Sequence, residues 1–165
     1  MALAESRFDS PCGELTVVTH DGRLVGLGFS DGDALLRRSL ARRFGTAPVA
    51  GPAPAGITRT LAAYFDGNIA VLDELEVDTG GTPFQQRVWR ALRRIPGGRT
   101  VAYRDLARTI GAPEAVRAVG AANGANPIGI VVPCHRVIAA DGALHGYAYG
   151  LDRKEWLLRH ESAIA

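Results

Sequence analysis

Apolar positions recur loosely at every second residue through residues 6–29, and glycine and proline divide them into short runs. Two of these runs, residues 15–17 and 24–29, are separated by Asp21-Gly22. An Asp-Gly pair between two alternating runs is typical of a β-hairpin turn. The pattern therefore predicts antiparallel strands at the start of the chain.

A helical pattern follows over residues 33–44, with a stripe of three leucines and Gly45 as its stop. Asp31 or Asp33 could cap this helix, and its four arginines are expected to face solvent. A loop rich in Ala, Pro and Gly is expected over residues 46–56.

The first half of the chain ends with two more elements. A short helix is expected over residues 57–65, and Leu72, Leu75 and Val77 suggest one further strand. The Asp-Thr-Gly-Gly sequence at residues 78–81 is typical of a boundary between two parts of a chain.

The second half reads as helices with clear beginnings. A capping box with proline at the first helical position starts a helix at Thr82, and one apolar face continues to Ile95. Two shorter helices are expected over residues 103–110 and 113–123. Because a tight turn containing Gly111 joins them, the pair fits a helix-turn-helix.

The helix over residues 113–123 carries one long cation, Arg117, on a face with the small residues Ala118 and Ala121. A helix face of alanines lets another backbone come close. Alternatively, the small residues pack inside the protein and Arg117 is an ordinary exposed side chain. The spacing fits both interpretations.

Residues 130–138 read Ile-Val-Val-Pro-Cys-His-Arg-Val-Ile. The β-branched flanks predict buried, strand-like backbone, whereas the centre holds a thiol, an imidazole and a guanidinium. Adjacent residues on a strand point to opposite faces. Cys134 and His135 can therefore act together only if the backbone bends after Pro133 or if a water molecule bridges them.

The last helix is expected to begin at Asp152 with a capping pattern, and it aligns Leu157, Leu158 and Glu161 on one stripe. A carboxylate on an apolar stripe requires a partner, and His135 is the candidate. Alternatively, Glu161 lies in water at a frayed helix end.

Cys134, His135 and Glu161 together fit the logic of an activated thiolate. A thiol becomes a strong nucleophile only as thiolate, and a base that a third group orients helps to form it. A buried free cysteine with a packing role is the alternative. That alternative explains Cys134 but not its His and Arg neighbours.

Composition and charge add two points. The chain has 165 residues and shows neither a secretory signal nor an apolar run near the ~20 residues of a membrane span. We therefore expect a cytoplasmic protein with Cys12 and Cys134 reduced. Residues 1–82 hold 7 Arg against 11 acids (7 − 11 = −4), and residues 83–165 hold 12 cations against 6 acids (12 − 6 = +6). This asymmetry suggests that the second half meets a polyanion.

Several motifs stand in order along the second half. They are Phe-Gln-Gln-Arg-Val-Trp at 84–89, Ile95-Pro96, Tyr103, Arg117-Ala118-Val119-Gly120, Asn126-Pro127, Pro133-Cys134-His135-Arg136-Val137, Gly146-Tyr147, and Lys154 with Leu157, Leu158 and Glu161. Together they resemble the O6-alkylguanine-DNA alkyltransferases. The resemblance covers the second half continuously and is weaker in the first, where it rests on Ser10-Pro11, Gly13, Tyr64-Phe65 and Gly67.

The resemblance implies an α+β protein. An N-terminal α/β domain over residues 1–80 would resemble ribonuclease H, with an antiparallel sheet, and a mostly helical domain over residues 81–165 would contain the helix-turn-helix. The partner would be double-stranded DNA with an alkylated guanine, bound through its minor groove with little sequence preference. We expect a monomer, associated with the nucleoid when bound to DNA; the sequence leaves cooperative binding open.

The resemblance also implies which residues bind DNA and rotate the base. Arg117 would take the place of the damaged nucleotide in the stack, with Ala118 and Ala121 against the groove. Arg136 is expected to bind DNA as well. Tyr103 would help the nucleotide to rotate and would protonate or hydrogen-bond the guanine.

In the implied chemistry, Asn126 orders the turn around the active site, and Glu161, His135 and a bridging water deprotonate Cys134. The thiolate then displaces guanine from the alkyl carbon without a metal or an organic cofactor. Because the thioether is not hydrolysed, each protein molecule would react once. Activity on O4-alkylthymine is left open.

The chain departs from the family pattern in the predicted substrate pocket, formed by Tyr147, Ala148, Tyr149 and Gly129. The family commonly has small residues where Tyr149 stands, so we expect this phenol to admit methyl adducts and to hinder benzyl adducts. Gly129 replaces a proline of some members, which predicts a more flexible pocket wall. Some relatives bind zinc, but Cys12 and His20 alone cannot supply four ligands, so we expect no metal.

Two other functions fit part of the pattern. A Cys-His hydrolase would turn over and would require an oxyanion hole, which no motif marks. A non-catalytic module would bind alkylated DNA, as some relatives that lack the cysteine do. The presence of Cys134 argues against the second alternative.

Overall fold

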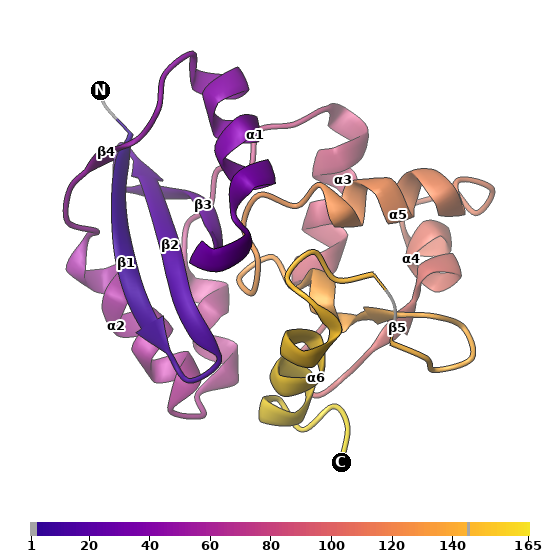
Figure 1. The fold of residues 1–165 in the computed structure, drawn as a ribbon. Coiled ribbons are helices and arrows are strands. Elements are labelled where there is room, and N and C mark those ends of the chain that lie inside the picture. Colours follow the sequence, from indigo (N-terminus) through magenta and orange to yellow (C-terminus); the bar gives the residue numbers. More distant parts are fainter. Residues whose placement is uncertain (1–2, 145) are drawn as a thin grey trace. The chain divides into compact units, whose positions relative to one another are not determined.

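The computed structural model describes residues 3–144 and 146–165 (Figure 1). It divides into two compact units: one formed by the chain up to Gly80 together with Pro127–Val131, the other by Gly81–Asn126 and Val132–Ala165. We expected a single boundary after residue 80. The structure differs because Pro127–Val131 returns to the first unit.

The first unit is built on a four-stranded sheet in the order β3-β2-β1-β4. Strands β1 (Ala4–Ser10), β2 (Gly13–His20) and β3 (Arg23–Phe29) are antiparallel, and β4 (Val49–Ala50) pairs with β1 in parallel. Asp21 and Gly22 connect β2 to β3 at φ angles of 52° and 76°. The Asp-Gly turn predicted from the sequence is therefore confirmed.

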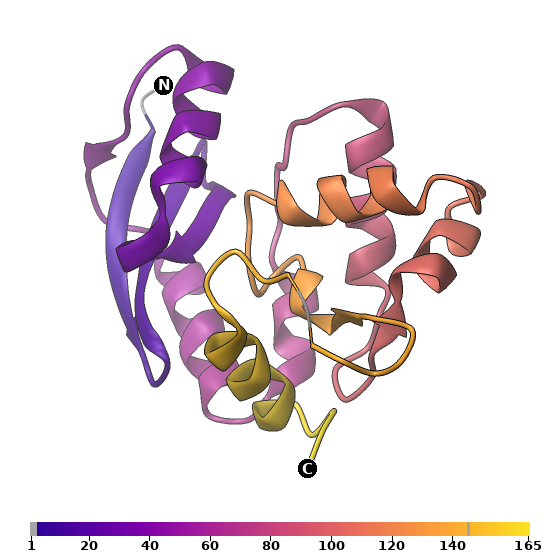
Figure 2. The same ribbon diagram turned by 45° about the vertical axis from the view of Figure 1, so that its right-hand side comes forward.

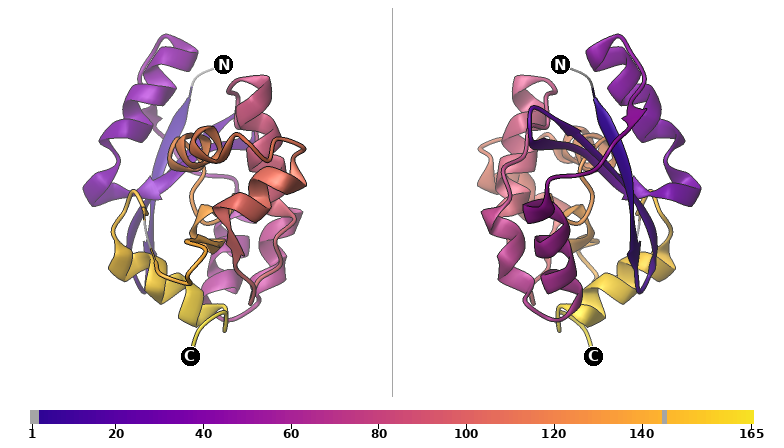
Figure 3. Two further views of the ribbon diagram at one scale, coloured as in Figure 1. Left: turned by 90° about the vertical axis from the view of Figure 1, so that its right-hand side faces the viewer. Right: turned by 90° about the vertical axis from the view of Figure 1, so that its left-hand side faces the viewer.

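Two helices cover opposite faces of this sheet, α1 (Ala34–Phe44) and α2 (Ala55–Phe65) (Figure 3). Side chains alternate between the faces of a strand. On one face, Val18 and Val25 belong to the apolar cluster that contains Leu36 and Leu40 of α1. On the other, Phe8 stacks on Phe65 of α2 with ring centroids 6.0 Å apart.

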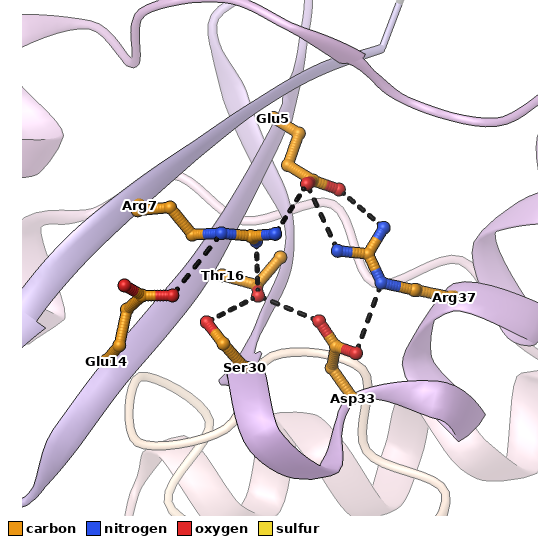
Figure 4. Close-up of polar contacts among 7 residues, drawn as sticks. All are labelled: Glu5, Arg7, Glu14, Thr16, Ser30, Asp33 and Arg37. Carbon is orange, nitrogen blue, oxygen red and sulfur yellow. Dashed lines mark hydrogen bonds and ion pairs between the residues drawn. The ribbon is translucent and has the colours of Figure 1, made fainter.

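A polar network ties the start of α1 to the sheet (Figure 4). Asp33 accepts hydrogen bonds from Thr16 at 2.8 Å and from Arg37 at 3.1 Å, and Arg37 also makes two hydrogen bonds to Glu5. The expected capping role of Asp33 is wrong, because its carboxylate makes these contacts and no side-chain cap bond. Arg37 is likewise paired, and so is Arg43, which binds Asp78 at 2.7 Å. The expectation of four solvent-facing arginines is confirmed for Arg38, Arg42 and Arg43, which are exposed, and fails in part for Arg37, which is half-buried.

The expected strand at residues 72–77 is wrong. A 3-10 helix, η2 (Ile69–Glu74), occupies its first half, because the three-residue spacing of Leu72 and Leu75 suits a 3-10 turn. A further 3-10 turn, η1 (Ser30–Gly32), precedes α1. Within residues 72–77, the β-pairing that the structure describes is an isolated bridge between Val77 and Leu24.

The segment Pro127–Val131 joins the first unit through β3. The Leu27 N–H donates to the Pro127 carbonyl at 3.0 Å, and the Gly129 N–H donates to the Leu27 carbonyl at 2.9 Å. Ile130 has a φ angle of 70° and is buried. Such a backbone conformation is rare for a β-branched residue.

In the second unit, α3 (Pro83–Arg93) begins with the predicted capping box, in which Thr82 and Gln85 bond reciprocally at 3.0 and 3.1 Å. The helices α4 (Tyr103–Thr109) and α5 (Val116–Gly124) follow. Helix α5 lies across α3 (Figure 2), where the Trp89 indole N–H donates to the Ala122 carbonyl at 2.8 Å. This bond fixes α5 from its buried side.

Helix α5 begins three residues later than predicted. Residues 112–115 form a turn in which the Ala115 N–H donates to the Ala112 carbonyl at 2.9 Å. The Ala115 backbone, at φ −98° and ψ 35°, then marks the boundary of the helix.

Two short parallel strands and a last helix complete the second unit. Strand β5 (Val101–Ala102) pairs with β6 (Val137–Ile138), and α6 (Leu151–His160) follows. Helix α6 begins at Leu151, and its N-cap is Gly150, which offers no side-chain cap, so the capping role expected of Asp152 is wrong. His145 lies outside the described residues. Within the described ranges, no helix combines the length and the apolar character needed to cross a membrane.

Candidate active site

The backbone bends at Cys134. The strand-like run ends at Pro133, and residues Cys134–Arg136 form a 3-10 turn, η3. The Cys134 N–H donates to the Val132 carbonyl at 2.8 Å, and the Arg136 N–H donates to the Pro133 carbonyl at 3.0 Å. The bend that the adjacent Cys and His required is therefore present.

Glu161 lies at the centre of a buried polar cluster. Its Oε2 atom is 2.9 Å from His135 Nε2 and 3.0 Å from Arg136 Nη2, and its Oε1 atom is 2.8 Å from Arg136 Nε. Its side chain has no exposed surface. The predicted contact between Glu161 and His135 is confirmed, and the alternative of a frayed helix end in water is wrong.

This cluster fixes the protonation of His135. Burial lowers the pKa of His135 despite the opposing effect of Glu161. Burial acts to raise the pKa of Glu161, but its contacts with His135 and Arg136 lower it well below its usual range. Because Arg136 already neutralises the carboxylate, the imidazole is neutral and its Nε2–H donates to Glu161. Nδ1, which has no hydrogen-bond partner in the part of the chain that the structure describes, is then a free acceptor.

The thiol is protonated in the resting protein. Burial raises the pKa of Cys134, while a hydrogen bond with Asn126 and the charge of Lys154 act in the opposite direction. Asn126 also donates from Nδ2 to the Val132 carbonyl at 2.7 Å, so it orders the turn before the cysteine. A neutral thiol beside a neutral imidazole requires a proton transfer before it can attack.

Tyr103 and the loop before α6 approach the same region of the second unit. Burial and the nearby Cys134 raise the pKa of Tyr103, whose side chain hydrogen-bonds with Asn123. A Cβ atom built on Gly146 would lie 3.6 Å from the Tyr103 hydroxyl. The structure therefore brings Tyr103, Asn126, Cys134, His135 and Glu161 into one unit.

The exposed face of α5 carries the three residues expected to meet DNA. Arg117, Ala118 and Ala121 are exposed, whereas Val119 and Asn123 are buried beneath them. Arg117 makes no ion pair or hydrogen bond with any described residue. A flat helix face with one free cation can approach a polyanion closely.

The family models decide the affiliation of the chain. Residues 83–163 match the 6-O-methylguanine DNA methyltransferase DNA binding domain, and residues 3–79 match the ribonuclease-like domain of the same methyltransferase. The chain belongs to the 6-O-methylguanine DNA methyltransferase family. The expected ribonuclease H-like first domain and helical second domain are confirmed as a fold class.

Relatives of this family match along nearly the whole chain. The methylated-DNA–protein-cysteine methyltransferase of Salmonella typhimurium is 50% identical over 168 residues, covering 99% of this chain and 98% of its own. The crystal structure of the Mycobacterium tuberculosis O6-methylguanine methyltransferase is 44% identical, with a TM-score of 0.81 and coverages of 99% and 94%. A second structure of the M. tuberculosis protein, in complex with DNA, is 43% identical, with a TM-score of 0.80 and the same coverages.

One expectation about this methyltransferase-family chain is corrected. We expected Arg136 to bind DNA. Its side chain is 6% exposed, its Nε and Nη2 atoms bind Glu161, and its Nη1 donates to the Ile95 carbonyl at 2.6 Å. Arg136 is therefore an internal partner of Glu161, because the bend that buries Cys134 buries the next two residues as well.

The expected pocket residues fall into two groups. In the second unit, Tyr147 is buried, Ala148 is exposed, and Tyr149 packs edge-on against Tyr147 with ring centroids 5.8 Å apart. Gly129 belongs instead to the first unit, where its N–H is held by Leu27. A backbone group held in this way does not support a more flexible wall, and its place in a pocket remains a prediction.

Two residues of the site had no predicted role. Lys154 is fully buried on α6 and donates from Nζ to the Val137 carbonyl at 2.6 Å. Its spacing of three and four residues from Leu157 and Leu158 was the signal that it points inward. Asn123 is 3% exposed on α5 and contacts the Cys134 carbonyl. A polar residue on the buried face of that helix was its signal.

Cys12 and His20, the two potential metal ligands that the sequence suggests in the first unit, lie at opposite ends of β2. Cys12 contacts Ser10 at 3.6 Å near the beginning of β2, and His20 lies at the end of that strand, where it contacts Asp21. Seven residues of extended strand span roughly 23 Å at ~3.3 Å per residue. Within the described ranges, no three His, Cys, Asp or Glu side chains gather as metal ligands.

Proposed function

We propose that the protein repairs DNA by direct reversal, transferring the alkyl group of O6-alkylguanine to Cys134 in a single, irreversible step. The observation that carries this proposal is the neutral His135, whose Nε2–H is held by Glu161 while its Nδ1 lone pair remains available on the residue that follows the protonated Cys134 in the chain. In this arrangement the imidazole of His135, oriented by Glu161, can act as the base that deprotonates the Cys134 nucleophile. The names of the relatives, which are methylated-DNA–protein-cysteine methyltransferases, support the same reaction.

The proposed reaction balances as follows. Nδ1 of His135 takes the Cys134 proton through a bridging water molecule, and the imidazolium that forms is stabilised by Glu161. The thiolate attacks the alkyl carbon, a carbon–sulfur bond forms, and the bond from this carbon to O6 breaks. Guanine leaves with the electron pair, and Tyr103 stabilises it by donating a hydrogen bond or a proton. The thioether has no route back to the thiol, so the protein is consumed.

The proposed partner is double-stranded DNA, bound through the exposed face of α5. Ala118 and Ala121 allow the helix to approach the minor groove closely, and Arg117 fills the stack after the alkylated nucleotide rotates out. Little sequence preference is expected, since the minor groove distinguishes base pairs poorly. We further propose a monomeric protein that resides in the cytoplasm and joins the nucleoid on binding DNA.

Mass spectrometry tests the transfer. The protein is incubated with a duplex containing one O6-methylguanine and then digested, and we expect one methyl group on the peptide that contains Cys134. Cys134→Ala should gain none, whereas Cys12→Ser removes the other thiol and should react like the wild type. Intact DNA binding without methylation would leave a non-catalytic module, and repeated turnover would point to a hydrolase.

A fluorescent base tests the proposed rotation. A 2-aminopurine placed beside the lesion brightens when its neighbour leaves the stack. Arg117→Ala should reduce this signal and slow the transfer. Ligands of the minor groove should compete with binding; competition restricted to ligands of the major groove would refute the proposed groove.

A further inference from the structure

The helix proposed to face DNA, α5, is held on its buried side by one tryptophan of α3. The indole Nε1–H of Trp89 donates to the Ala122 carbonyl oxygen at 2.8 Å, and Trp89 is only 4% exposed. Ala122 lies in the last turn of α5, where carbonyl oxygens lack the usual helical partner four residues on. It directly follows Ala121, one of the exposed small residues of the proposed DNA-binding face. The position of the indole therefore affects where that face lies.

The six-membered ring of the same indole packs against Gly81. A Cβ atom built on Gly81 would lie 2.5 Å from Cζ3 and 2.8 Å from Cη2 of Trp89. Because carbon atoms in contact stay about 3.5–4.0 Å apart, a methyl group at this position would have to displace the ring by about 1 Å. Gly81, Trp89 and Ala122 all belong to the second unit. The absence of a side chain at Gly81 thus leaves the space that the indole occupies.

The backbone of Gly81 is itself held in place. Its carbonyl oxygen accepts a hydrogen bond from Nε2 of Gln86 at 3.2 Å, and the next residue, Thr82, bonds reciprocally with Gln85 in the capping box. A side chain added at Gly81 would therefore displace the indole and not the backbone. Since an indole is rigid, a shift of its six-membered ring by about 1 Å also moves Nε1 and breaks a hydrogen bond of normal length.

We propose that Gly81 and Trp89 are positioning residues for DNA binding. The missing side chain of Gly81 admits the indole, and the indole N–H fixes the end of α5 so that its exposed alanines can meet the minor groove. This inference rests on the proposed role of α5 in binding DNA. The turn before α5 is held by the same helix α3, because Arg87 donates to the Ile110 carbonyl oxygen. Helix α5 is thus fixed at both ends by side chains of α3.

The position of α5 matters because its proposed contact with DNA is a close one. Small residues allow a helix to enter a groove deeply only when the helix lies at the right depth and angle, and misplacement by about 1 Å is enough to weaken such a contact. The loss of the hydrogen bond that sets this position corresponds to about a 10-fold change in affinity. Gly81 would therefore act on DNA binding without touching DNA.

The test compares two adjacent glycines. Gly80 also has a positive φ angle, 59° against 86° for Gly81, but a Cβ atom there would meet the guanidinium of Arg43, the end of a flexible side chain. Gly80→Ala and Gly81→Ala therefore share the backbone strain of an alanine at positive φ and differ in whether they displace the indole. Fluorescence anisotropy with an unmodified duplex measures affinity. Single-turnover transfer from an O6-methylguanine duplex, at increasing protein concentration, separates the half-saturating concentration from the maximal rate.

Gly81→Ala should bind the duplex about 10-fold more weakly and should raise the half-saturating concentration by a similar factor. Its maximal rate should change little, and Gly80→Ala should match the wild type in both measurements. Concentrations are corrected for the fraction of protein that accepts a methyl group, so that a merely structural loss of stability leaves the half-saturating concentration unchanged.

Trp89→Phe removes the indole N–H together with the ring that packs against Gly81. It should weaken binding by about 10-fold, and adding Gly81→Ala should weaken it no further, because both changes act through the same indole. Additive losses in the double variant, an equal loss in Gly80→Ala, or wild-type affinity in folded Trp89→Phe would overturn the inference. Trp89→Phe also decides it if Gly81→Ala does not fold. If the wild type binds the duplex but transfers no methyl group, the proposed reaction alone fails and the affinities still decide; a wild type that binds no DNA would overturn both.

Discussion

The Nε2 atom of His135 lies 2.9 Å from Oε2 of Glu161, and neither side chain has any exposed surface. Glu161→Gln should therefore slow methyl transfer and move its pH dependence to higher pH, because a neutral amide stabilises the imidazolium poorly. Rates measured between pH 6 and pH 9 provide the check. Glu155→Gln removes an exposed carboxylate of the same helix, paired with Arg159 at 2.6 Å, and should leave the profile unchanged. A wild-type profile in Glu161→Gln would remove Glu161 from the mechanism.

His135 and Glu161 should make the protein less stable in acid. Burial lowers the pKa of His135 in the folded state, so below about pH 6.5 the unfolded chain binds a proton that the folded protein rejects. Its contribution to stability is therefore complete above pH 6.5 and decreases as the pH falls. The lowered pKa of Glu161 has the same sign, and its contribution begins to decrease below about pH 4.3.

Urea denaturation between about pH 7.5 and pH 3.5 measures this linkage. The free energy of unfolding should decrease by up to about 1.4 kcal/mol per pH unit in the range where His135 titrates. His135→Gln should lose this part of the slope while retaining the decrease below about pH 4.3. An equally steep decrease in His135→Gln would assign the effect to other groups.

Arg136 should affect stability and not the affinity for DNA. Arg136→Gln leaves the Glu161 carboxylate buried without its cation and should lower the free energy of unfolding by about 3–5 kcal/mol. Arg117→Gln is the opposite case, because Arg117 is exposed and has no partner among the described residues. This variant should change the free energy of unfolding by less than about 0.5 kcal/mol and should weaken DNA binding. Chemical denaturation and fluorescence anisotropy separate the two variants. Weakened binding by folded Arg136→Gln would restore the original expectation for Arg136.

Lys154 should lower the pKa of the thiol. Its buried ammonium group donates to the Val137 carbonyl and opposes the effect of burial on Cys134. Lys154→Met should raise the apparent pKa of the Cys134 thiol, measured from the pH dependence of its alkylation by iodoacetamide. Arg159→Met removes an exposed cation from the same helix and should leave this pKa unchanged. The measurement follows alkylation of the Cys134 peptide against pH. Coincident profiles for all three proteins would rule out the electrostatic role.

Tyr149 should restrict the size of the transferred group. It stands where the family commonly has a small residue, and it packs against the buried Tyr147. Transfer from O6-benzylguanine should therefore be slow relative to O6-methylguanine, and Tyr149→Gly should narrow the difference. Single-turnover rates on both substrates give the comparison. Equally fast benzyl transfer in the wild type, unchanged in the glycine variant, would show that Tyr149 does not limit the pocket.

The sequence predicted features that depend on neighbours along the chain. The capping box at Thr82 and the Asp21-Gly22 turn were found because local hydrogen bonding and backbone geometry determine them. The pairing of His135 with Glu161 was also predicted, because a carboxylate aligned with the apolar stripe of a helix has few alternatives to an internal partner.

Features that depend on distant parts of the chain were missed. Asp33 binds Thr16 of β2 instead of capping its helix, because the sheet brings this distant hydroxyl to it, and Arg37 of the same helix joins the contact while it also binds Glu5 of β1. In the sequence, Arg136 was indistinguishable from the other cations of the basic second half. Only the 3-10 turn at Cys134–Arg136 shows that its side chain points into the protein. The place of Pro127–Val131 likewise depends on β3, a strand about one hundred residues earlier.

That placement has a consequence for synthesis on the ribosome. The backbone N–H and carbonyl of Leu27 are paired by Pro127 and Gly129, which emerge only after the whole helix-turn-helix has been translated. While residues 81–126 are being made, a nascent chain therefore leaves the edge of β3 around Leu27 unpaired, although Glu76 and Asp78 can already pair with Leu24, and such an edge can pair with other chains. The acidic first half thus completes its fold only after much of the basic second half exists.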